Sequence, residues 1–161
     1  MNFWERTIRN HGLEHGTISI LMSQQNASGP LAGYSIPSGF FIVGNVSLGE
    51  TKSAADAALR EFQKGRTSLA ISPFCGTNIL TSALLTTITS LATFKLSGGG
   101  LRGFSRSVSN AALALVLSQP LGKNLQKKFT TSPNMNEIFI EKIKKYEVGP
   151  TKIYWIKTGS Y

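Results

Sequence analysis

The sequence predicts an α+β protein, a small sheet with two helices, interrupted by an inserted membrane helical hairpin. The first observation is an uncharged run of 27 residues, Ser68 to Phe94. A bilayer span needs about 20 apolar residues, and a core helix seldom needs so long an uncharged run. The second is strand-like alternation on both sides of that run, and the third is a pair of helical segments before it. The predicted division is residues 1–74 for an N-terminal α+β part, 75–128 for the membrane helical hairpin, and 129–161 for a C-terminal β-hairpin that completes the α+β domain.

The segment 3–23 is predicted to be an amphipathic helix, because apolar residues and both histidines recur at spacings of four and three. The inward stripe is expected to be Trp4, Ile8, His11, His15, Ile18 and Met22. Gly12 and Gly16 weaken this helix by about 1 kcal/mol each relative to alanine. They also allow another segment to approach the backbone beside the histidines.

A hairpin of strands 31–35 and 40–46 is predicted around Pro37-Ser38-Gly39, whose residues favour a tight turn. A second helix is expected over 48–64, with Ser47 as its cap, Glu50 completing a capping box and Gly65 stopping it. The apolar run 69–72 is predicted to be a short third strand.

The membrane part begins with a helix over 77–94, which rises about 27 Å at 1.5 Å per residue. Its many serines and threonines indicate packing against another helix. After a glycine-rich break, 107–122 is a second uncharged segment of 16 residues. Because this is short for a span, a tilted, re-entrant or interfacial helix remains open beside a full crossing.

Strands are predicted over 136–145 and 152–157, joined around Val148-Gly149-Pro150 and added to the upstream sheet. This topology inserts the membrane hairpin between the third and fourth of five strands.

The net charge of +9 arises locally, because no acidic residue occurs between Glu61 and Glu137. Basic residues flanking apolar spans suit anionic lipid headgroups. The outer flanks carry more cations than the connecting loop, which favours a cytoplasmic position for both soluble parts. We therefore expect membrane lipids and other membrane protein subunits as partners. Nucleic acid is not the expected partner, because these charges bracket apolar segments and do not form one stripe with interleaved aromatics.

One constellation carries a chemical mechanism: His11, Glu14 and His15 form the pattern H-x-x-E-H. Two imidazoles at i and i+4 on a helix share a face and can bind one Zn²⁺, with Glu14 as general base for a metal-bound water. The third ligand is not identified by spacing, although a His, His, Cys site results if the fold places Cys75 against the two rings. The alternative is a structural pair of histidines that bind backbone carbonyls.

Three segments together resemble a family of uncharacterised small membrane proteins common in cyanobacteria. They are Arg9-Asn10-His11-Gly12-Leu13-Glu14-His15, the strand pair with Gly39-Phe40 and Gly44-Asn45-Val46, and Cys75-Gly76-Thr77-Asn78 before a Thr/Leu-rich span. The resemblance runs from about Arg9 to the last strands, implies a membrane protein and implies no activity. The five residues His11 to His15 are also similar to the motif of inverted-zincin metallopeptidases.

We therefore expect an integral protein of a bacterial cytoplasmic or thylakoid membrane, a non-enzymatic structural or interaction subunit with a metal site on its first helix. Zinc is the candidate cofactor. One alternative is a zinc-dependent membrane hydrolase using His11, His15 and Glu14. The other is a basic soluble nucleic-acid-binding protein.

Overall fold

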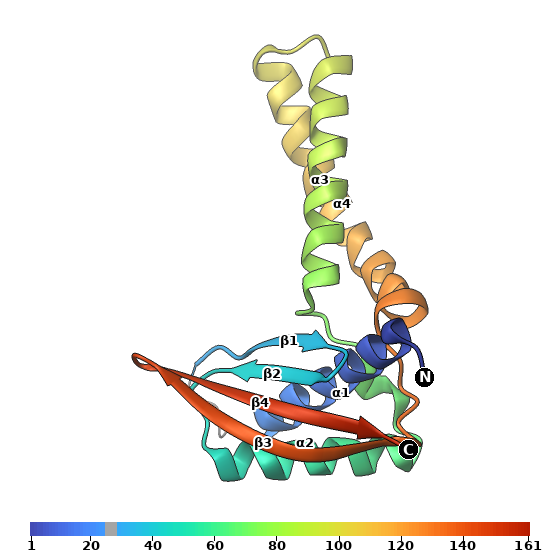
Figure 1. Cartoon of the computed structure of the whole chain (residues 1–161). Helices are drawn as coiled ribbons and strands as arrows, with labels where there is room; N and C mark the ends of the chain where they lie inside the picture. Colours follow the sequence, from blue (N-terminus) through green and yellow to red (C-terminus); the bar gives the residue numbers. More distant parts are fainter. Residues whose placement is uncertain (25–28) are drawn as a thin grey trace. The chain divides into compact units, whose positions relative to one another are not determined.

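The computed structural model describes residues 1–24 and 29–161, and it confirms the α+β class (Figure 1). The chain forms two compact units, one of residues 1–72 and 129–161, the other of residues 73–128. The elements of the first unit are α1 (Phe3–Ser23), β1 (Ala32–Ile36), β2 (Gly39–Val43), α2 (Leu48–Gln63), the 3₁₀ turn η1 (Thr67–Ala70), β3 (Ile138–Val148) and β4 (Thr151–Ser160). The second unit consists of α3 (Gly76–Leu96) and α4 (Gly100–Leu125), and the π-helical turn η2 (Gln126–Thr130) links it to the first.

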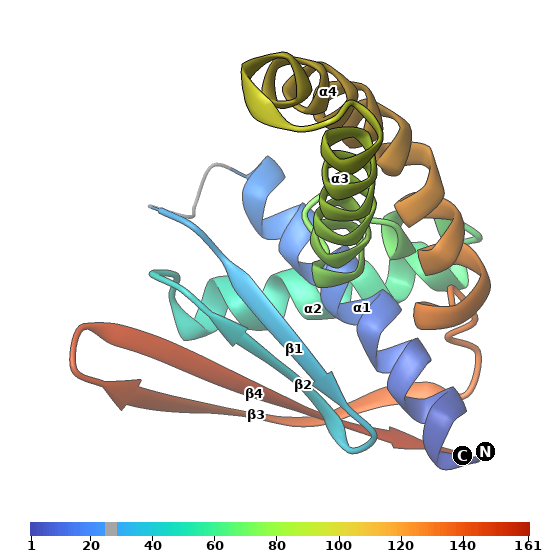
Figure 2. The ribbon, with the colours of Figure 1, turned by 90° about the horizontal axis from the view of Figure 1, so that it is seen from above.

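The sheet of the first unit has the strand order β1-β2-β4-β3, and all neighbouring strands are antiparallel. The predicted hairpin is confirmed, with Ile36 paired to Gly39 across the two-residue turn Pro37–Ser38. The C-terminal strands are also confirmed and join the upstream sheet through β4, which pairs with β2. Helices α1 and α2 pack against each other on one side of the sheet, and within the described residues of the first unit no helix covers its other face (Figure 2).

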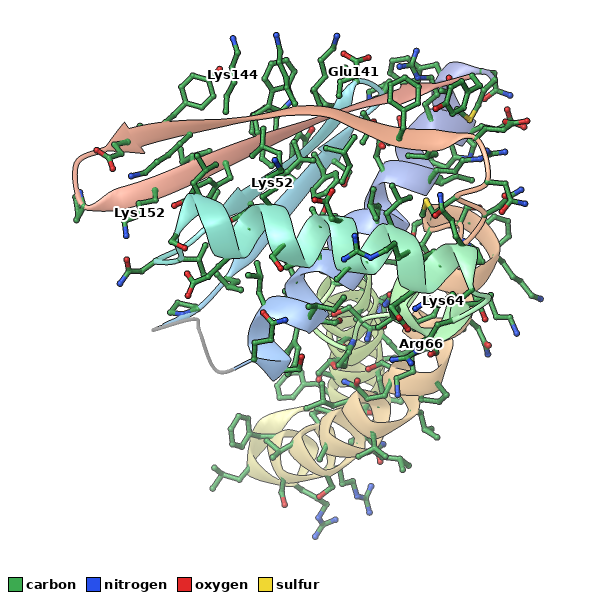
Figure 3. The ribbon with its side chains drawn as sticks, turned by 90° about the horizontal axis from the view of Figure 1, so that it is seen from below. Lys52, Lys64, Arg66, Glu141, Lys144 and Lys152 are labelled. Atoms are coloured by element: carbon green, nitrogen blue, oxygen red, sulfur yellow. The ribbon has the colours of Figure 1, made fainter. Side chains whose placement is uncertain are left out.

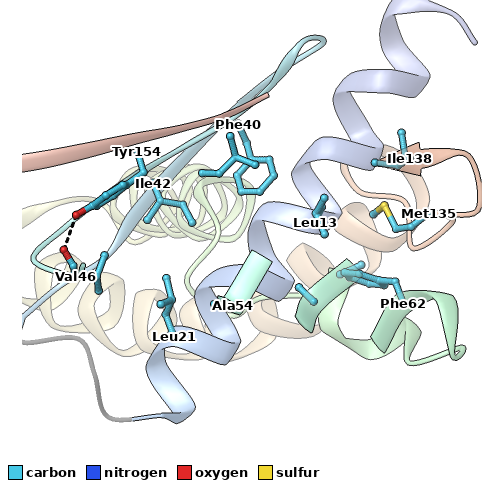
Figure 4. Packing of buried hydrophobic residues seen from close by; sticks show 13 residues of the cluster. Leu13, Leu21, Phe40, Ile42, Val46, Ala54, Phe62, Met135, Ile138 and Tyr154 are labelled. Carbon is cyan, nitrogen blue, oxygen red and sulfur yellow. Dashed lines mark hydrogen bonds between the residues drawn. The ribbon is translucent and has the colours of Figure 1, made fainter. Parts of the chain in front are cut away.

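The core lies between the sheet and these two helices, where Leu13 and Leu21 of α1 meet Phe40 and Ile42 of β2 (Figure 4). The Tyr154 hydroxyl donates a hydrogen bond of 2.5 Å to the Val46 carbonyl inside this core. Burial raises the pKa of Tyr154, so the phenol remains a hydrogen-bond donor well above neutral pH.

Helix α1 has the predicted bounds, but its predicted inward stripe is wrong at both ends, because Trp4 and Met22 are exposed. The buried face is instead centred on Leu13, Thr17 and Leu21. The error follows from counting the histidines as the middle of the stripe, whereas the side of α1 that meets the sheet is turned away from them.

The two glycines of α1 admit neighbours closely, as predicted. A Cβ on Gly12 would overlap the Ser132 carbonyl oxygen, and one on Gly16 would lie 2.7 Å from the Phe62 ring of α2. Beside Gly12, the segment that follows η2 is held in place, because Ser132 N–H donates to the Ile8 carbonyl at 2.9 Å.

Helix α2 confirms the predicted capping box, in which the Ser47 hydroxyl accepts from Glu50 N–H and the Glu50 carboxylate accepts from Ser47 N–H. The predicted third strand at 69–72 is wrong. Residues 67–70 form the turn η1, packed on α1, and the inserted helices therefore lie between the second and third of four strands. A short apolar run has no periodicity that separates a strand from a buried helical turn.

The second unit is a pair of helices joined through glycines, with Gly98, Gly99 and Gly100 all at positive φ. The two helices bond through polar side chains. Ser82 and Ser118 hydroxyls lie 2.6 Å apart, Ser107 donates to the Ser90 carbonyl at 3.1 Å, and Asn110 donates to Thr93 Oγ1 at 3.0 Å. The predicted role of the hydroxyl-rich segment in helix packing is thereby confirmed.

The apolar side chains of this pair point outward. Those that are exposed on α3 are Ile79, Leu80, Leu84, Ile88, Leu91, Phe94 and Leu96. On α4 the exposed apolar residues are Leu101, Phe104, Val108, Leu113, Leu115, Val116, Leu117 and Leu121. Within residues 1–24 and 29–161, α3 alone is long and apolar enough to cross a bilayer.

Replacing a helical glycine with alanine usually stabilises a helix. The close approaches at α1 predict the opposite effect there. Gly12→Ala and Gly16→Ala should each lower the free energy of unfolding by about 1–3 kcal/mol, because the added methyl overpacks the contact with Ser132 or Phe62. Gly49→Ala in α2 is the matched control. Its Cβ would make only an ordinary contact, 4.0 Å from Ser47 Oγ, so helix propensity should raise stability by up to about 1 kcal/mol. Denaturant unfolding of the three variants measures this, and equal effects would contradict the packing.

Candidate functional site

The two helical turns of α1 from Asn10 to Thr17 contain the site that the sequence singles out. Its first member, Asn10, was missed by sequence reasoning, although an asparagine beside an apolar helix face is a usable signal for a buried hydrogen-bonding group. Asn10 is buried and its amide donates to the carbonyls of Ile36 and Pro37 at 2.8 and 3.2 Å. Its own oxygen accepts from Thr158 Oγ1 at 2.7 Å. This residue ties α1 to the β1–β2 turn and to β4.

His11 and His15 each bind a backbone carbonyl through Nδ1. His11 Nδ1 lies 2.7 Å from the Thr130 oxygen, and His15 Nδ1 lies 2.8 Å from the Ala70 oxygen. Ala70 belongs to the chain that leads out of the first unit, and Thr130 belongs to the chain that leads back into it. One turn of α1 therefore holds both connections.

These two contacts fix the tautomers. A carbonyl oxygen only accepts, so each Nδ1 carries the proton and each neutral ring has its lone pair on Nε2. The ring centroids lie 4.4 Å apart, with ring planes at 62°. A histidine that ligates a metal usually donates its other ring N–H to a carbonyl or carboxylate in this way, because the bond orients the ring and raises its basicity.

Glu14 lies on the sheet side of the same turn and is 4% exposed. Its carboxylate accepts a 2.5 Å hydrogen bond from Ser35 Oγ of β1 and lies over Gly33, where any Cβ would overlap it. The Glu14 carboxylate is thus attached to β1, and the Nδ1 atoms of the histidines are attached to the two connecting segments. The role of Glu14 as a general base remains a prediction.

Cys75 belongs to the second unit, where it is the N-cap residue of α3. Its carbonyl accepts from Asn78 N–H at 2.9 Å and from Ile79 N–H at 3.2 Å, which begins the helix. The two histidines belong to the first unit, and the grouping of Cys75 with them remains a prediction.

The hydrogen bond between His15 Nδ1 and the Ala70 carbonyl predicts that His15→Ala and His15→Asn differ in stability. His15→Ala should lower the free energy of unfolding by about 1–3 kcal/mol, because the Ala70 carbonyl loses its donor inside the fold. His15→Asn should lose less, since its amide nitrogen occupies nearly the position of Nδ1. Denaturant unfolding compares them, and an alanine variant as stable as the parent chain would contradict the bond's structural role.

Comparison with known proteins agrees with the predicted cyanobacterial kinship. An uncharacterised protein of Picosynechococcus sp. (strain PCC 7002) is 31% identical over 135 residues, which cover 78% of this chain and 66% of the relative. No solved structure matches the chain. The family model described as Domain of unknown function (DUF6391) matches residues 6–143. The chain therefore belongs to the DUF6391 family.

Proposed function

We propose that the protein is an integral membrane protein in which the helical pair α3–α4 inserts into the bilayer and anchors the α+β unit as a structural or interaction subunit. One observation carries the proposal. The two helices contact each other through hydroxyls and an amide, with Ser107 and Ser118 buried, while most of the leucines, isoleucines and phenylalanines are exposed.

This arrangement is the reverse of a water-soluble helical pair, whose apolar stripe faces inward. In lipid there is no hydrophobic force between helices, so small and hydroxyl residues form the contact and apolar side chains face the acyl chains. In water each of those leucines would forgo about 1.5–3 kcal/mol relative to burial. At 1.5 Å per residue, the 21 residues of α3 extend about 31 Å, close to the hydrocarbon thickness.

The anchor predicts that the full chain stays with membranes after extraction with alkaline carbonate and leaves them only with detergent. Ile88→Arg should reduce the carbonate-resistant fraction, because an arginine at a helix centre costs about 2.5–3.5 kcal/mol of insertion free energy. Val148→Arg on β3 is a control of matched exposure, 64% against 62% for Ile88, and should not change it.

Membrane fractionation followed by immunoblotting measures both. Complete recovery of the parent chain in the carbonate supernatant would refute the anchor. Equal carbonate-resistant fractions for Ile88→Arg and Val148→Arg would also refute it, because Ile88 would then be an ordinary water-exposed residue.

We further propose that helix α1 ligates a divalent transition metal, with zinc as the candidate, through the Nε2 atoms of His11 and His15. The supporting observation is the pair of Nδ1 contacts with backbone carbonyls, which leaves the ligating nitrogen of each ring as the one carrying the lone pair. Ring centroids at 4.4 Å place both imidazoles within reach of one ion, since metal–nitrogen bonds are about 2.0–2.1 Å.

Cys75 is the third ligand that we propose, on two grounds. Thiolate is a preferred ligand of zinc, and only four residues of chain separate Cys75 from Ala70, which His15 binds. Because the Glu14 carboxylate is bonded to Ser35, the arrangement favours ligation over hydrolysis, and a zinc hydrolase remains the alternative.

The asparagine variants are predicted to lose metal affinity and to retain their folding stability. His11→Asn with His15→Asn retains a donor for each carbonyl and removes both Nε2 ligands, so metal affinity should fall at least about tenfold while the fold is retained. Titration of detergent-purified protein with Co²⁺ measures this. Loss of the thiolate charge-transfer band in Cys75→Ser identifies the third ligand.

Undiminished Co²⁺ binding by the double asparagine variant would contradict the metal site.

For the hydrolase alternative, peptidase activity of the zinc-loaded chain should disappear in Glu14→Gln, and activity that survives the substitution would exclude Glu14 as base.

A further inference from the structure

The face of the sheet opposite α1 and α2 carries aromatic and basic side chains at paired positions of neighbouring strands. Gly33 and Ser35 contact Glu14 of α1, so Tyr34 between them points to the opposite side. By the same alternation Phe41 lies between the core residues Phe40 and Ile42, and Trp155 lies between the core residues Tyr154 and Ile156. We call the side chains opposite the helices the outer face.

The strand pairing places these residues in a row. Tyr34 is paired with Phe41, Phe41 with Trp155, and Trp155 with Lys144, across all four strands. The rings of Phe41 and Trp155 are stacked, with centroids 6.3 Å apart and planes at 19°. Sequence alone does not reveal this row, because its four members come from segments separated by up to about 120 residues.

Positive charge borders the row. Lys142 is paired with Lys157 in the adjacent position, and Lys157 binds Glu141 at 2.5 Å. Lys142 and Lys144 are exposed, and neither forms an ion pair within residues 1–24 and 29–161. Figure 3 shows Lys144 and Glu141 projecting from the side of the sheet away from α2.

We propose that the outer face binds single-stranded nucleic acid, with bases stacked on Tyr34, Phe41 and Trp155 and phosphates on Lys142 and Lys144. Stacking platforms combined with backbone-tracking cations are the means by which sheets bind single strands without reading sequence. The ligand is complementary in charge to this face and to the chain, whose net charge is +9.

The position of the rings favours a nucleic acid over a bilayer surface. Phe41 and Trp155 are half-buried and stacked on each other, so a base would extend this existing stack. Side chains that dock in the bilayer interface instead project several ångströms to reach the acyl chains. Of the three rings in this row, only that of Tyr34, 69% exposed, projects into solvent.

The test uses the full chain in nanodiscs of zwitterionic phosphatidylcholine, with Trp4→Phe so that Trp155 is the single tryptophan. A short oligothymidylate should quench Trp155 fluorescence saturably. An equivalent duplex should quench it less, because its bases are already stacked. Absence of quenching at high oligonucleotide concentration would overturn the proposal. A Trp155 response to phosphatidylglycerol vesicles but not to the oligonucleotide would also overturn it, in favour of a lipid surface.

Variants locate the site. Lys142→Glu with Lys144→Glu should weaken binding at least tenfold and make the log–log salt dependence shallower by about 1.4, since each of the two bound phosphates contributes about 0.7 to the slope. Tyr34→Ala should weaken it about fivefold or more through lost stacking. Lys52→Glu on α2 with Lys64→Glu at its C-cap makes the same change in net charge on another surface (Figure 3) and should have a much smaller effect.

Equal weakening by the two charge-reversal pairs would overturn the proposal, because binding would then follow net charge and not the outer face. Thermal unfolding of each variant verifies that the fold is retained, and Tyr34→Ala, which alters only an exposed side chain, keeps the test decisive if a charge reversal destabilises the sheet.

Discussion

Two imidazole–carbonyl hydrogen bonds on one turn of α1 are the constraint on which the organisation of the chain depends. His15 holds Ala70 on the segment that leaves the first unit, and His11 holds Thr130 on the segment that returns. Since the two histidines are one helical turn apart, the chain returns beside the place it left. A net gain of about 0.5–1.5 kcal/mol for each bond is modest, but losing a partner for a buried carbonyl costs more. The glycines beside the histidines serve the same packing, because Gly12 admits the returning backbone at Ser132.

The two units bury opposite kinds of side chain. In the first, Leu13, Phe40 and Tyr154 lie inside and lysines lie outside. In the second, Ser107 and Ser118 are buried between the helices and most leucines are exposed. A single solvent does not favour both arrangements. The difference supports a chain whose two units meet different media, and it explains why composition alone, averaged over both, is uninformative.

Sequence patterns were sufficient for elements governed by local chemistry. The capping box of Ser47 and Glu50, the Pro37–Ser38 turn and the glycine break before α4 follow from neighbours a few residues apart. The segment 69–72 was misassigned because its conformation is set by packing on α1. The stripe of α1 was misplaced for a similar reason, since His11 and His15 face connecting segments and the sheet contacts another side. Within the candidate site, the helical spacing of the histidines was readable, but their carbonyl partners and the attachment of Glu14 to β1 depend on tertiary contacts.

The position of β4 has a consequence for biosynthesis. This strand pairs with both β2 and β3, and it follows α3 and α4 in the chain. A ribosome thus delivers the whole helical pair before the sheet can close. The early segments remain an incomplete half-sheet, with the edge of β2 that pairs with β4 open, until β4 has been synthesised. If the helical pair inserts into a bilayer as proposed, the α+β unit completes its sheet only after the helices have been synthesised, and a chain that fails to insert is still unfolded and open to proteolysis.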